Sequence, residues 1–427
     1  MTPEIKQKIE QIRRGEVPEG YKRTKAGVVP VEWEEVRIGD VLTQRKTLQC
    51  VSEDAPLLSF TIEEGVIDPA NKKSNKRDFL IKDVTTKKFA LTEVGDIIYN
   101  PANLKFGAIH RNNLRRGVVS PIYGIFYGEQ DSIFMGYLLH NQRFIDYAKI
   151  YTEGTVEKLK TLKAETFLKL KITLPPIDEQ KKIAKILLAQ DKKIELQEKI
   201  ISEMQTLKNI CLMNMCPKAG ELFPKWRFPL YTDTWKYCKL QDMSELITKG
   251  TSPLDKFDKG DINFIKVENI DSQSGEIIPK SKISIREHNG YLKRSQLKEK
   301  DILFSIAGTL GRIGVITKNL LPANTNQALA IIRPLIDNTD YIATVLKGNI
   351  VAEFIKKNPT IGAQPNLSLE QIAKMNIPCP SIEEQKAIGS YFITLDKFIK
   401  LNTLKLAELV NEKKALMQLL LTGIVRV

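Results

Sequence analysis

The chain has 427 residues, enough for two or three domains with hydrophobic cores of ordinary size. Hydrophobic residues make up 42% and charged residues 27%, a balance typical of a soluble globular protein rather than of a disordered or membrane-spanning one. The 65 lysines and arginines exceed the 51 aspartates and glutamates, which gives a net charge of +14 and favours a polyanionic partner such as nucleic acid.

The N-terminal residues and the cysteines indicate a compartment. The first residues contain no apolar stretch of the kind that a signal peptide needs, and the longest apolar run, 417–421, is far too short to span a bilayer. The 5 cysteines are odd in number and lack paired spacing, which argues against a disulfide framework or a zinc site. We therefore expect a cytoplasmic protein with no membrane partner.

In chain order, the sequence divides into six segments. They are an N-terminal basic extension (1–30), a first α+β domain (31–175), a central long helix (176–216), a linker (217–230), a second α+β domain (231–379) and a C-terminal long helix (380–427). Short runs of strand composition alternate with turns in both domains, for example at 96–99, 301–306, 314–317 and 328–333. Residues 341–357 have the pattern of a helix.

The second half of the sequence repeats the first. Three pairs of segments align at a spacing of 202 to 205 residues: 33–41 with 235–243, 95–100 with 300–305, and 176–181 with 380–386. Three landmarks in one order at nearly one spacing indicate a tandem duplication of a unit of roughly 200 residues.

Both long helices have recognisable starts and ends. Pro176 opens the central helix with acidic residues in its first turn, and 381–384 is a capping box for the C-terminal one. We expect Pro217 and Gly423 to end them.

Apolar residues recur in heptads along both helices, in rows that match at a shift of 205. A helix of about 35 residues is roughly 50 Å long, and an apolar seam of that length must be covered. We expect the two helices to pack antiparallel as a coiled coil, with Gln190, Gln197 and Asn402 fixing the register at some cost in stability. The alternative is that each seam packs only on its own domain. The predicted packing residues are Ile183, Leu187, Ile194, Ile201, Met204, Ile388, Phe392, Leu395, Ile399, Leu406, Leu409 and Leu416.

Motifs for catalysis are few. There is no Walker A sequence, and the glycines of 308–314 lack the dinucleotide-binding spacing, so we interpret them as a turn between strands. The three histidines, His110, His140 and His288, have no partners at the spacing of a metal site or a catalytic triad.

Two partial motifs point to DNA-modifying enzymes, and neither is complete. Residues 100–103 are similar to the loop that holds a flipped adenine in DNA methyltransferases, but they lack its second proline and its aromatic residue. The Glu-x-Lys sequences at 179–181 and 384–386 occur in metal-dependent nucleases, but here they fall in the first turn of a helix, where capping explains them. We therefore expect no catalytic or metal site in this chain.

Polar and basic residues gather in loops at matching places of the two repeats. Amide side chains suit adenine edges, arginine suits guanine, and runs of lysine and arginine suit phosphates. Each residue alone could equally be an ordinary surface residue, whereas the set as a whole favours DNA. The DNA-binding candidates are Gln44, Arg45, Lys46, Lys72, Lys73, Lys76, Arg77, Asn103, Lys105, Arg111, Arg115, Arg116, Lys249, Thr251, Ser252, Arg312, Asn324, Asn326, Gln327, Gln364 and Asn366.

The chain resembles the specificity subunit of type I restriction–modification systems. The resemblance rests on the openings at 30–40 and 228–240, the helix starts at 176–180 and 380–385, and the ending at 419–427, and it covers nearly the whole chain. It implies two target recognition domains of α+β fold, each reading one half of a split DNA site, and two helices that set the spacer.

The resemblance also implies the partners. They are double-stranded DNA, two DNA adenine methyltransferase subunits docked on the helices, and restriction/translocase subunits. The resemblance further implies that this chain binds no cofactor, because S-adenosylmethionine, ATP and Mg²⁺ belong to the partner subunits.

Two other functions are open at this point. One is a self-contained DNA adenine methyltransferase or nuclease, which the missing cofactor and metal motifs disfavour. The other is a coiled-coil assembly scaffold, which leaves the charge of +14 and the two duplicated domains unexplained.

Overall fold

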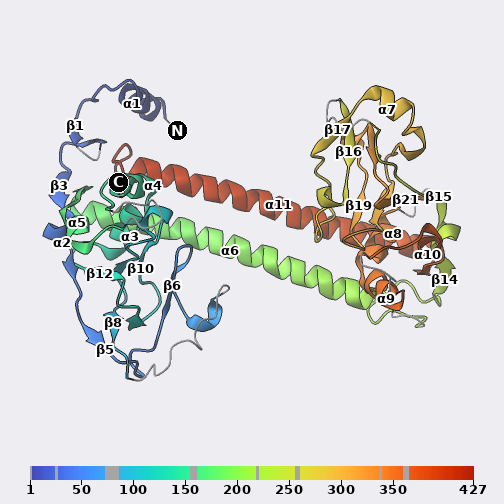
Figure 1. Cartoon of the computed structure of the whole chain (residues 1–427), viewed down its shortest axis with the longest axis horizontal. Coiled ribbons are helices and arrows are strands. Elements are labelled where there is room, and N and C mark those ends of the chain that lie inside the picture. Colours follow the sequence, from blue (N-terminus) through green and yellow to red (C-terminus); the bar gives the residue numbers. More distant parts are fainter. Residues whose placement is uncertain are drawn as a thin grey trace. The chain divides into compact units, whose positions relative to one another are not determined.

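The computed structural model describes residues 2–24, 27–72, 86–153, 161–217, 221–254, 260–335, 339–358 and 365–427 (Figure 1). The chain folds into two compact units. Unit 1 consists of Met1–Leu196 and Ala407–Val427, and unit 2 of Gln197–Leu406. Each unit therefore holds one α+β domain, the first part of one long helix and the last part of the other.

The described part of unit 1 contains two antiparallel sheets, of four strands (β10-β9-β12-β4) and three strands (β11-β8-β5), besides three two-stranded pairs. Its elements are α1 (Pro3–Arg13), β1 (Tyr21–Thr24), β2 (Gly27–Pro30), β3 (Glu34–Arg37), α2 (Ile38–Val41), β4 (Thr43–Gln44), β5 (Leu48–Gln49), β6 (Ser59–Thr61), β7 (Gly65–Ile67), η1 (Pro69–Asn71), β8 (Phe89–Thr92), β9 (Ile97–Tyr99), η3 (Leu104–Phe106), β10 (Ile109–Arg111), β11 (Gly117–Val119), β12 (Gly124–Tyr127), α3 (Ser132–His140), α4 (Gln142–Lys149), α5 (Ala164–Lys169), β13 (Lys171–Leu174) and the start of α6 (Ile177–Met215).

The described part of unit 2 has a similar plan, with an antiparallel sheet of four strands (β15-β21-β18-β19), a three-stranded sheet (β17-β16-β20) in which β16 and β20 are parallel, and the pair β14–β22. Its elements are β14 (Lys236–Lys239), η5 (Leu240–Met243), β15 (Ser244–Lys249), β16 (Ile262–Ile265), η6 (Val267–Asn269), β17 (Ser281–Ile283), α7 (Ile285–Asn289), η7 (Lys293–Ser295), β18 (Ile302–Ser305), β19 (Ile313–Val315), η8 (Lys318–Leu320), β20 (Ala323–Thr325), β21 (Leu329–Pro334), α8 (Thr339–Lys347), α9 (Asn349–Lys357), α10 (Leu369–Ala373), β22 (Asn376–Cys379) and the start of α11 (Ile382–Leu420).

The strands predicted from the repeated segments lie in the middle of the four-stranded sheets. Every residue of β9 and of β18 is buried, since a neighbouring strand covers each edge and side chains cover both faces. The predicted helix at 341–357 is wrong in one respect. It is two helices, α8 and α9, because Gly348 adopts an extended conformation between them.

The long helices join the domain cores. In unit 1, Ile183 and Leu187 of α6 belong to one hydrophobic cluster with Trp33, and Leu416 and Leu420 of α11 pack in it. In unit 2, the corresponding cluster contains Trp235, Ile388 and Phe392, together with Cys211 and Met215 from the end of α6. At each end of the seam, the helices pack both on each other and on the α+β domain of that unit. The packing of helix on helix and the packing of helix on domain therefore occur together.

Between these clusters, polar pairs connect the helices. Gln190 Nε2 donates to Leu409 O at 3.0 Å in unit 1, and Gln197 Nε2 donates to Asn402 Oδ1 at 2.7 Å in unit 2. Partner numbers fall as α6 advances, so the helices run antiparallel in both units. The other seam candidates, Ile194, Ile201, Met204, Leu395, Ile399, Leu406 and Leu409, are half-buried.

Two ion pairs repeat the duplication across the seam. Lys413 contacts Asp191 in unit 1, and Lys208 contacts Asp396 in unit 2, each at 2.5 Å. Both the aspartates and the lysines are 205 residues apart, so each pair joins equivalent positions of the two helices. Because amide and charged pairs tolerate few alternative alignments, they specify the register of the helices.

Each unit also contains a tryptophan–glutamate–arginine triad, in which the tryptophan and the glutamate are buried. In unit 2, Glu384 accepts two bonds of 2.7 Å from Arg227 and one of 3.1 Å from the Trp235 indole. In unit 1, Glu179 accepts from Arg426 at 2.6 and 2.9 Å and from Trp33 at 3.3 Å. Capping is therefore an incomplete explanation of these glutamates. Ser381 does accept a bond from the Glu384 amide, but the Glu384 carboxylate turns to the arginine instead of closing the box.

The helix α11 ends at Leu420, shortly before Gly423, the residue that the sequence predicts to end it. Gly423 adopts a left-handed conformation (φ +69°), and Leu421 and Val425 then pack in the core of unit 1. The Tyr21 hydroxyl donates to the Gly423 carbonyl at 2.9 Å, which ties the N-terminal hairpin β1–β2 to this tail. None of the helices in the described ranges combines the length and the apolar character that a bilayer span requires.

Candidate nucleic-acid interface

Three loops of unit 2 meet at one edge of its sheets. Thr251 N donates to Thr325 O at 3.0 Å, Ser252 Oγ donates to Gln327 Oε1, and Arg294 Nε donates to Thr251 Oγ1 at 3.0 Å. We call Thr251, Ser252, Arg294, Asn326 and Gln327 the loop cluster. Its hydroxyl, amide and guanidinium groups are of the kinds that bind base edges and phosphates.

A glycine makes this juxtaposition feasible. A Cβ atom at Gly250 would lie only 2.2 Å from the carbonyl oxygens of Thr325 and Asn326. The loop that follows β15 can therefore approach the β20–β21 loop so closely only with glycine at this position. The sequence candidates Thr251 and Ser252 on one side and Asn326 and Gln327 on the other are thus brought together, while Lys249 is exposed at the end of β15.

The prediction that Asn324 reads a base is wrong. The residue is fully buried in β20, its amide donates to Leu292 O at 2.9 Å and Ser295 Oγ at 3.2 Å, and its Oδ1 is bonded to the His288 ring. All its polar atoms are used to hold the α7–η7 segment on the sheet, so none is left for DNA.

The prediction for Arg312 is also corrected. Its Nη1 donates to the carbonyls of Val267 and Ile270, at 3.3 and 2.9 Å, and its Nε is buried. The guanidinium therefore fastens the η6 turn instead of facing solvent.

The candidates near residue 365 lie beside the loop cluster. Gln364 lies outside the described residues, and Asn366 is exposed. Asn366 pairs with Ala307, and the neighbouring Ile306 bonds to Ala328 O at 2.9 Å, one residue after Gln327. Asn366 thus extends the same surface.

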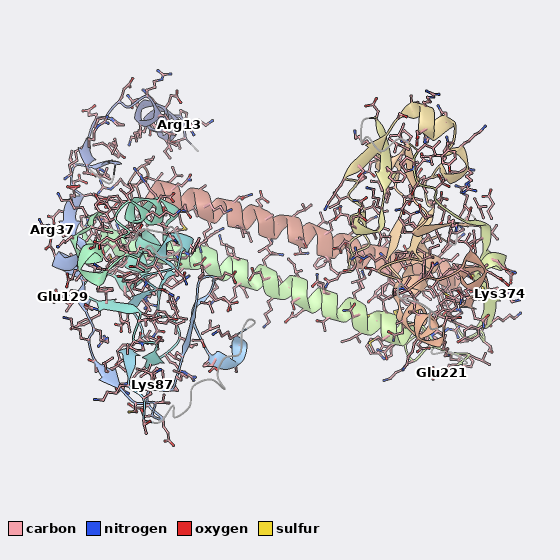
Figure 2. The ribbon with its side chains drawn as sticks, in the orientation of Figure 1. Arg13, Arg37, Lys87, Glu129, Glu221 and Lys374 are labelled. Carbon is pink, nitrogen blue, oxygen red and sulfur yellow. The ribbon has the colours of Figure 1, made fainter. Side chains whose placement is uncertain are left out.

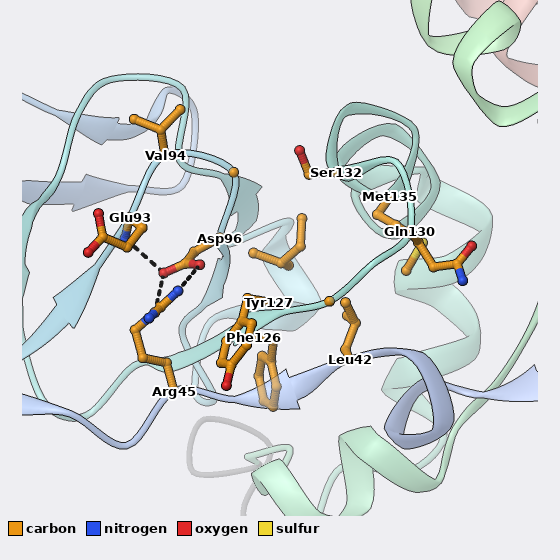
Figure 3. Close-up of a pocket in the computed structure, with 13 residues that line it drawn as sticks. Leu42, Arg45, Glu93, Val94, Asp96, Phe126, Tyr127, Gln130, Ser132 and Met135 are labelled. Carbon is orange, nitrogen blue, oxygen red and sulfur yellow. Dashed lines mark hydrogen bonds and ion pairs between the residues drawn. The ribbon is translucent and has the colours of Figure 1, made fainter. Parts of the chain in front are cut away.

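In unit 1, Arg45 is committed to a buried carboxylate. Its Nε and Nη2 donate to Asp96 at 2.7 and 2.9 Å, and the pair forms the wall of a cavity of about 270 Å³ (Figure 3). The bonded carboxylate raises the pKa of Arg45. Its guanidinium also lies 4.5 Å from the centre of the Tyr127 ring. The prediction that Arg45 contacts DNA directly is therefore wrong.

Unit 2 contains an equivalent arginine–aspartate ion pair, but its arginine comes from a different strand. Asp301, the counterpart of Asp96 at a shift of 205, accepts bonds of 2.7 and 2.8 Å from Arg333 on β21. The repeat thus preserves the ion pair while its arginine comes from another place in the sequence.

The remaining unit 1 candidates divide by their surroundings. Arg115 pairs with Asp68, and Arg116 with Glu93 and Asp54, in exposed positions where an ion pair contributes little and a phosphate can replace the carboxylate. Arg111 donates to Ser132 Oγ at 3.0 Å. Lys46 is exposed, whereas Gln44, Lys72, Asn103 and Lys105 are half-buried. Gln44 also pairs with Phe126 in the sheet. Lys73, Lys76 and Arg77 lie outside the described residues. In Figure 2, Arg37, Lys87 and Glu129 mark the outer surface of unit 1.

A family model for the type I restriction modification DNA specificity domain matches residues 30–206 and 232–411. The chain belongs to this family. Each matched stretch contains one α+β domain and most of the long helix that follows it, so the specificity domain occurs twice.

Relatives named as specificity subunits align with the chain. The type I restriction enzyme MjaVIII specificity subunit of Methanocaldococcus jannaschii is 24% identical over 430 residues, which cover 96% of both chains. The putative MjaX specificity subunit of the same organism is 24% identical over 431 residues, covering 96% of this chain and 97% of that one. The EcoBI specificity subunit of Escherichia coli is 26% identical over 277 residues, covering 58% and 57%.

Solved structures agree on the fold of the specificity subunit. The crystal structure of a type I restriction–modification S subunit from M. genitalium has a TM-score of 0.55 at 15% identity, over 91% of this chain and 96% of that one. A structure from work on assembly and conformational transition of a type I R-M system has a TM-score of 0.55 at 16% identity, over 93% and 99%. At such identities the likeness establishes fold, here two α+β domains and two long helices.

Two further polar residues of these specificity domains were not predicted from the sequence. Arg294 joins the loop cluster from the turn after α7, and Tyr127 presents a ring that is 44% exposed beside Arg45. An isolated arginine or tyrosine has no periodicity or spacing to mark it. Tyr127 is the last residue of β12, a strand that was not predicted from the sequence.

A histidine pair in unit 1 gives its stability a pH dependence. The rings of His110 and His140 lie 4.3 Å apart, and His110 Nε2 is 2.7 Å from Ile62 O. Burial, and then the neighbouring His140, lower the pKa of His110 to about 4. Below the ordinary value of about 6.5 the unfolded chain binds a proton that the folded chain does not.

We therefore expect the melting temperature of the chain to fall as the pH falls from about 6.5 towards 4. Above that range His110 should contribute nothing to the pH dependence of the melting temperature. Thermal unfolding across this range, compared with a His110→Gln variant that can still donate to Ile62 O, measures it. A variant with the same pH slope as the wild type would show that His110 is not responsible.

Proposed function

We propose that this chain reads DNA sequence for a type I restriction–modification complex, and that each α+β domain reads one half of a split target. The observation that carries the proposal is the occurrence of the specificity domain twice in one chain. The loop cluster of unit 2, the exposed arginines of unit 1 and the net charge of +14 supply base-edge and phosphate contacts.

Catalysis, in this proposal, belongs to partner subunits in the cytoplasm. Methyltransferase subunits use S-adenosylmethionine, and restriction subunits use ATP and Mg²⁺. Two features speak against an enzyme in this chain. The Asn100 side chain accepts a bond of 3.0 Å from the Ala102 amide, which makes 100–103 a turn, and the glutamates of both Glu-x-Lys sequences are bonded to tryptophan and arginine.

The two long helices are the proposed dock for the methyltransferase subunits. Besides the seam, they carry apolar side chains in solvent. In unit 2 alone, Leu207 is 38% exposed, Phe398 45%, Leu401 64% and Leu404 58%. Large apolar side chains that remain in solvent along a helix pair favour a protein interface.

The helices also set the spacer between the half-sites in this proposal. Both α6 and α11 are continuous over 39 residues, and each begins in one unit and ends in the other. Seven residues inserted in both helices, near Leu196 and Leu401, keep the heptad seam and add about 10 Å. We expect the variant to keep its half-sites and to prefer a spacer longer by up to about three base pairs. Mapping of methylated adenines measures this, and an unchanged spacer with intact binding would contradict it.

The proposal as a whole is tested by reconstitution. The purified chain, incubated alone with duplex DNA and S-adenosylmethionine, should transfer no methyl group but should retard DNA in a gel. Addition of its methyltransferase partner should give adenine methylation at one bipartite site. Methyl transfer by the chain alone would favour an enzyme, and absence of any DNA binding would favour a scaffold.

A further inference from the structure

A basic cavity lies in unit 2, apart from the loop cluster. It has a volume of about 400 Å³ and is bounded by the turn before β18, the first residues of α8 and the first turns of α11. Lys300, Lys386 and Lys397 line it with Thr339 and Ser390. Asp340 is the carboxylate among the described lining residues, so the cavity has an excess of positive charge.

The backbone of Lys300, which lines this cavity, has a strained conformation. It is the one non-glycine residue with a positive φ (+70°) among those the structure describes. Its counterpart in the first repeat, 205 residues earlier, is Gly95, with φ +98°. The turn therefore demands a left-handed conformation that glycine adopts freely and lysine does not. A lysine at this position destabilises the turn relative to glycine, which points to a function for its ammonium group.

Unit 1 places a cation at the equivalent point by another route. A Cβ atom at Gly95 would lie 3.7 Å from Arg111 Nη2 and 3.3 Å from Ser132 Oγ, at the start of α3. In unit 2 the Lys300 side chain shares its cavity with Thr339, at the start of α8. Both repeats thus combine a cation with a hydroxyl at the start of a helix.

We propose that the cavity lined by Lys300, Thr339, Ser390 and Lys397 binds a phosphate group. Two ammonium groups and two hydroxyls suit its oxygens, and neither Lys300 nor Lys397 forms an ion pair with any described residue, whereas Lys386 already has an interaction of its own. The phosphate comes either from the backbone of the DNA duplex or from a free nucleotide. The first source rests on the proposed function, whereas the second does not.

The decisive variant is Lys300→Gly, because it removes the ammonium group while restoring the residue that the first repeat uses. We expect its melting temperature to equal or exceed that of the wild type by about 2 °C. A loss of ligand binding then cannot be ascribed to unfolding. Lys397→Gln removes the second cation, and Lys405→Gln, at an exposed position of the same helix outside the cavity, is the matched control.

Two measurements on the full chain identify the source. If the duplex supplies the phosphate, the double variant Lys300→Gly/Lys397→Gln binds DNA about tenfold more weakly, and its plot of log affinity against log salt is shallower by about 1. If a free nucleotide supplies it, the salt slope is unchanged, but pyrophosphate no longer raises the melting temperature as it does for the wild type and Lys405→Gln.

A double variant that matches the wild type in both measurements would overturn the phosphate site and would point to an acidic protein partner instead. A wild-type chain that fails to bind DNA contradicts the proposed function, yet its stabilisation by pyrophosphate still tests the cavity.

Discussion

Replacing residues 240–375 by the same segment of a related specificity subunit is expected to change one half of the methylated sequence completely and to leave the other half as it was. The reason lies in how the domain closes. The Leu240 amide bonds to the Met375 carbonyl at 2.9 Å, so the exchanged segment begins and ends at one point. The strands β14 and β22 and the triad at Glu384 remain native.

The duplication supplies a matched control for this exchange. In unit 1 the Ile38 amide bonds to the Leu170 carbonyl at 2.9 Å, in the same relation to its own triad. Exchange of 38–170 should change the opposite half-site. Mapping methylated adenines by sequencing DNA treated with each reconstituted complex reads both halves at once. A change of both halves in either chimera would show that the domains do not read independently.

Substitution of Glu384 by glutamine is expected to destabilise unit 2 by about 3 kcal/mol. The Glu384 side chain is only 1% exposed and Arg227 13%, so the arginine would keep its charge in a mostly buried place without a counter-ion. Urea unfolding followed by tryptophan fluorescence measures the effect, with the exposed Glu408→Gln on the same helix as control.

The equivalent change in unit 1 should have a smaller effect. Arg426 is 39% exposed and also contacts Glu32, so it keeps water and one carboxylate after Glu179→Gln. The expected order is therefore Glu384→Gln, then Glu179→Gln, then Glu408→Gln. Equal losses in the free energy of unfolding for the two triad variants would mean that burial of the arginine does not determine the size of the loss.

The helices and the duplication could be predicted from sequence because both leave periodic signals. Heptad rows, capping residues and three aligned segments are local or regularly spaced, and the apolar rows at 183 and 388 lie in the cores as the periodicity indicates. The register of the seam also follows from residue type, because Gln197 and Asn402 have few partners in an apolar row.

The candidate DNA contacts were less predictable because solvent exposure is decided by distant residues. Arg45 turns to Asp96, 51 residues away, and Asn324 is enclosed by Leu292 and Ser295. A polar residue in a turn has the same appearance in sequence whether it faces solvent or supports a neighbouring loop. The triads are harder still, since Glu179 and Arg426 are 247 residues apart.

This last separation has a consequence for biosynthesis. A protein made from its N-terminus usually completes its first domain while the ribosome is still translating the later ones. Here the first domain lacks part of its core, Leu420, Leu421 and Val425, and the arginine partner of Glu179 until residues 420–426 have been translated. A nonsense mutation at or shortly before the codon of Arg426 removes this arginine, so the damage falls on the half of the protein that was synthesised first.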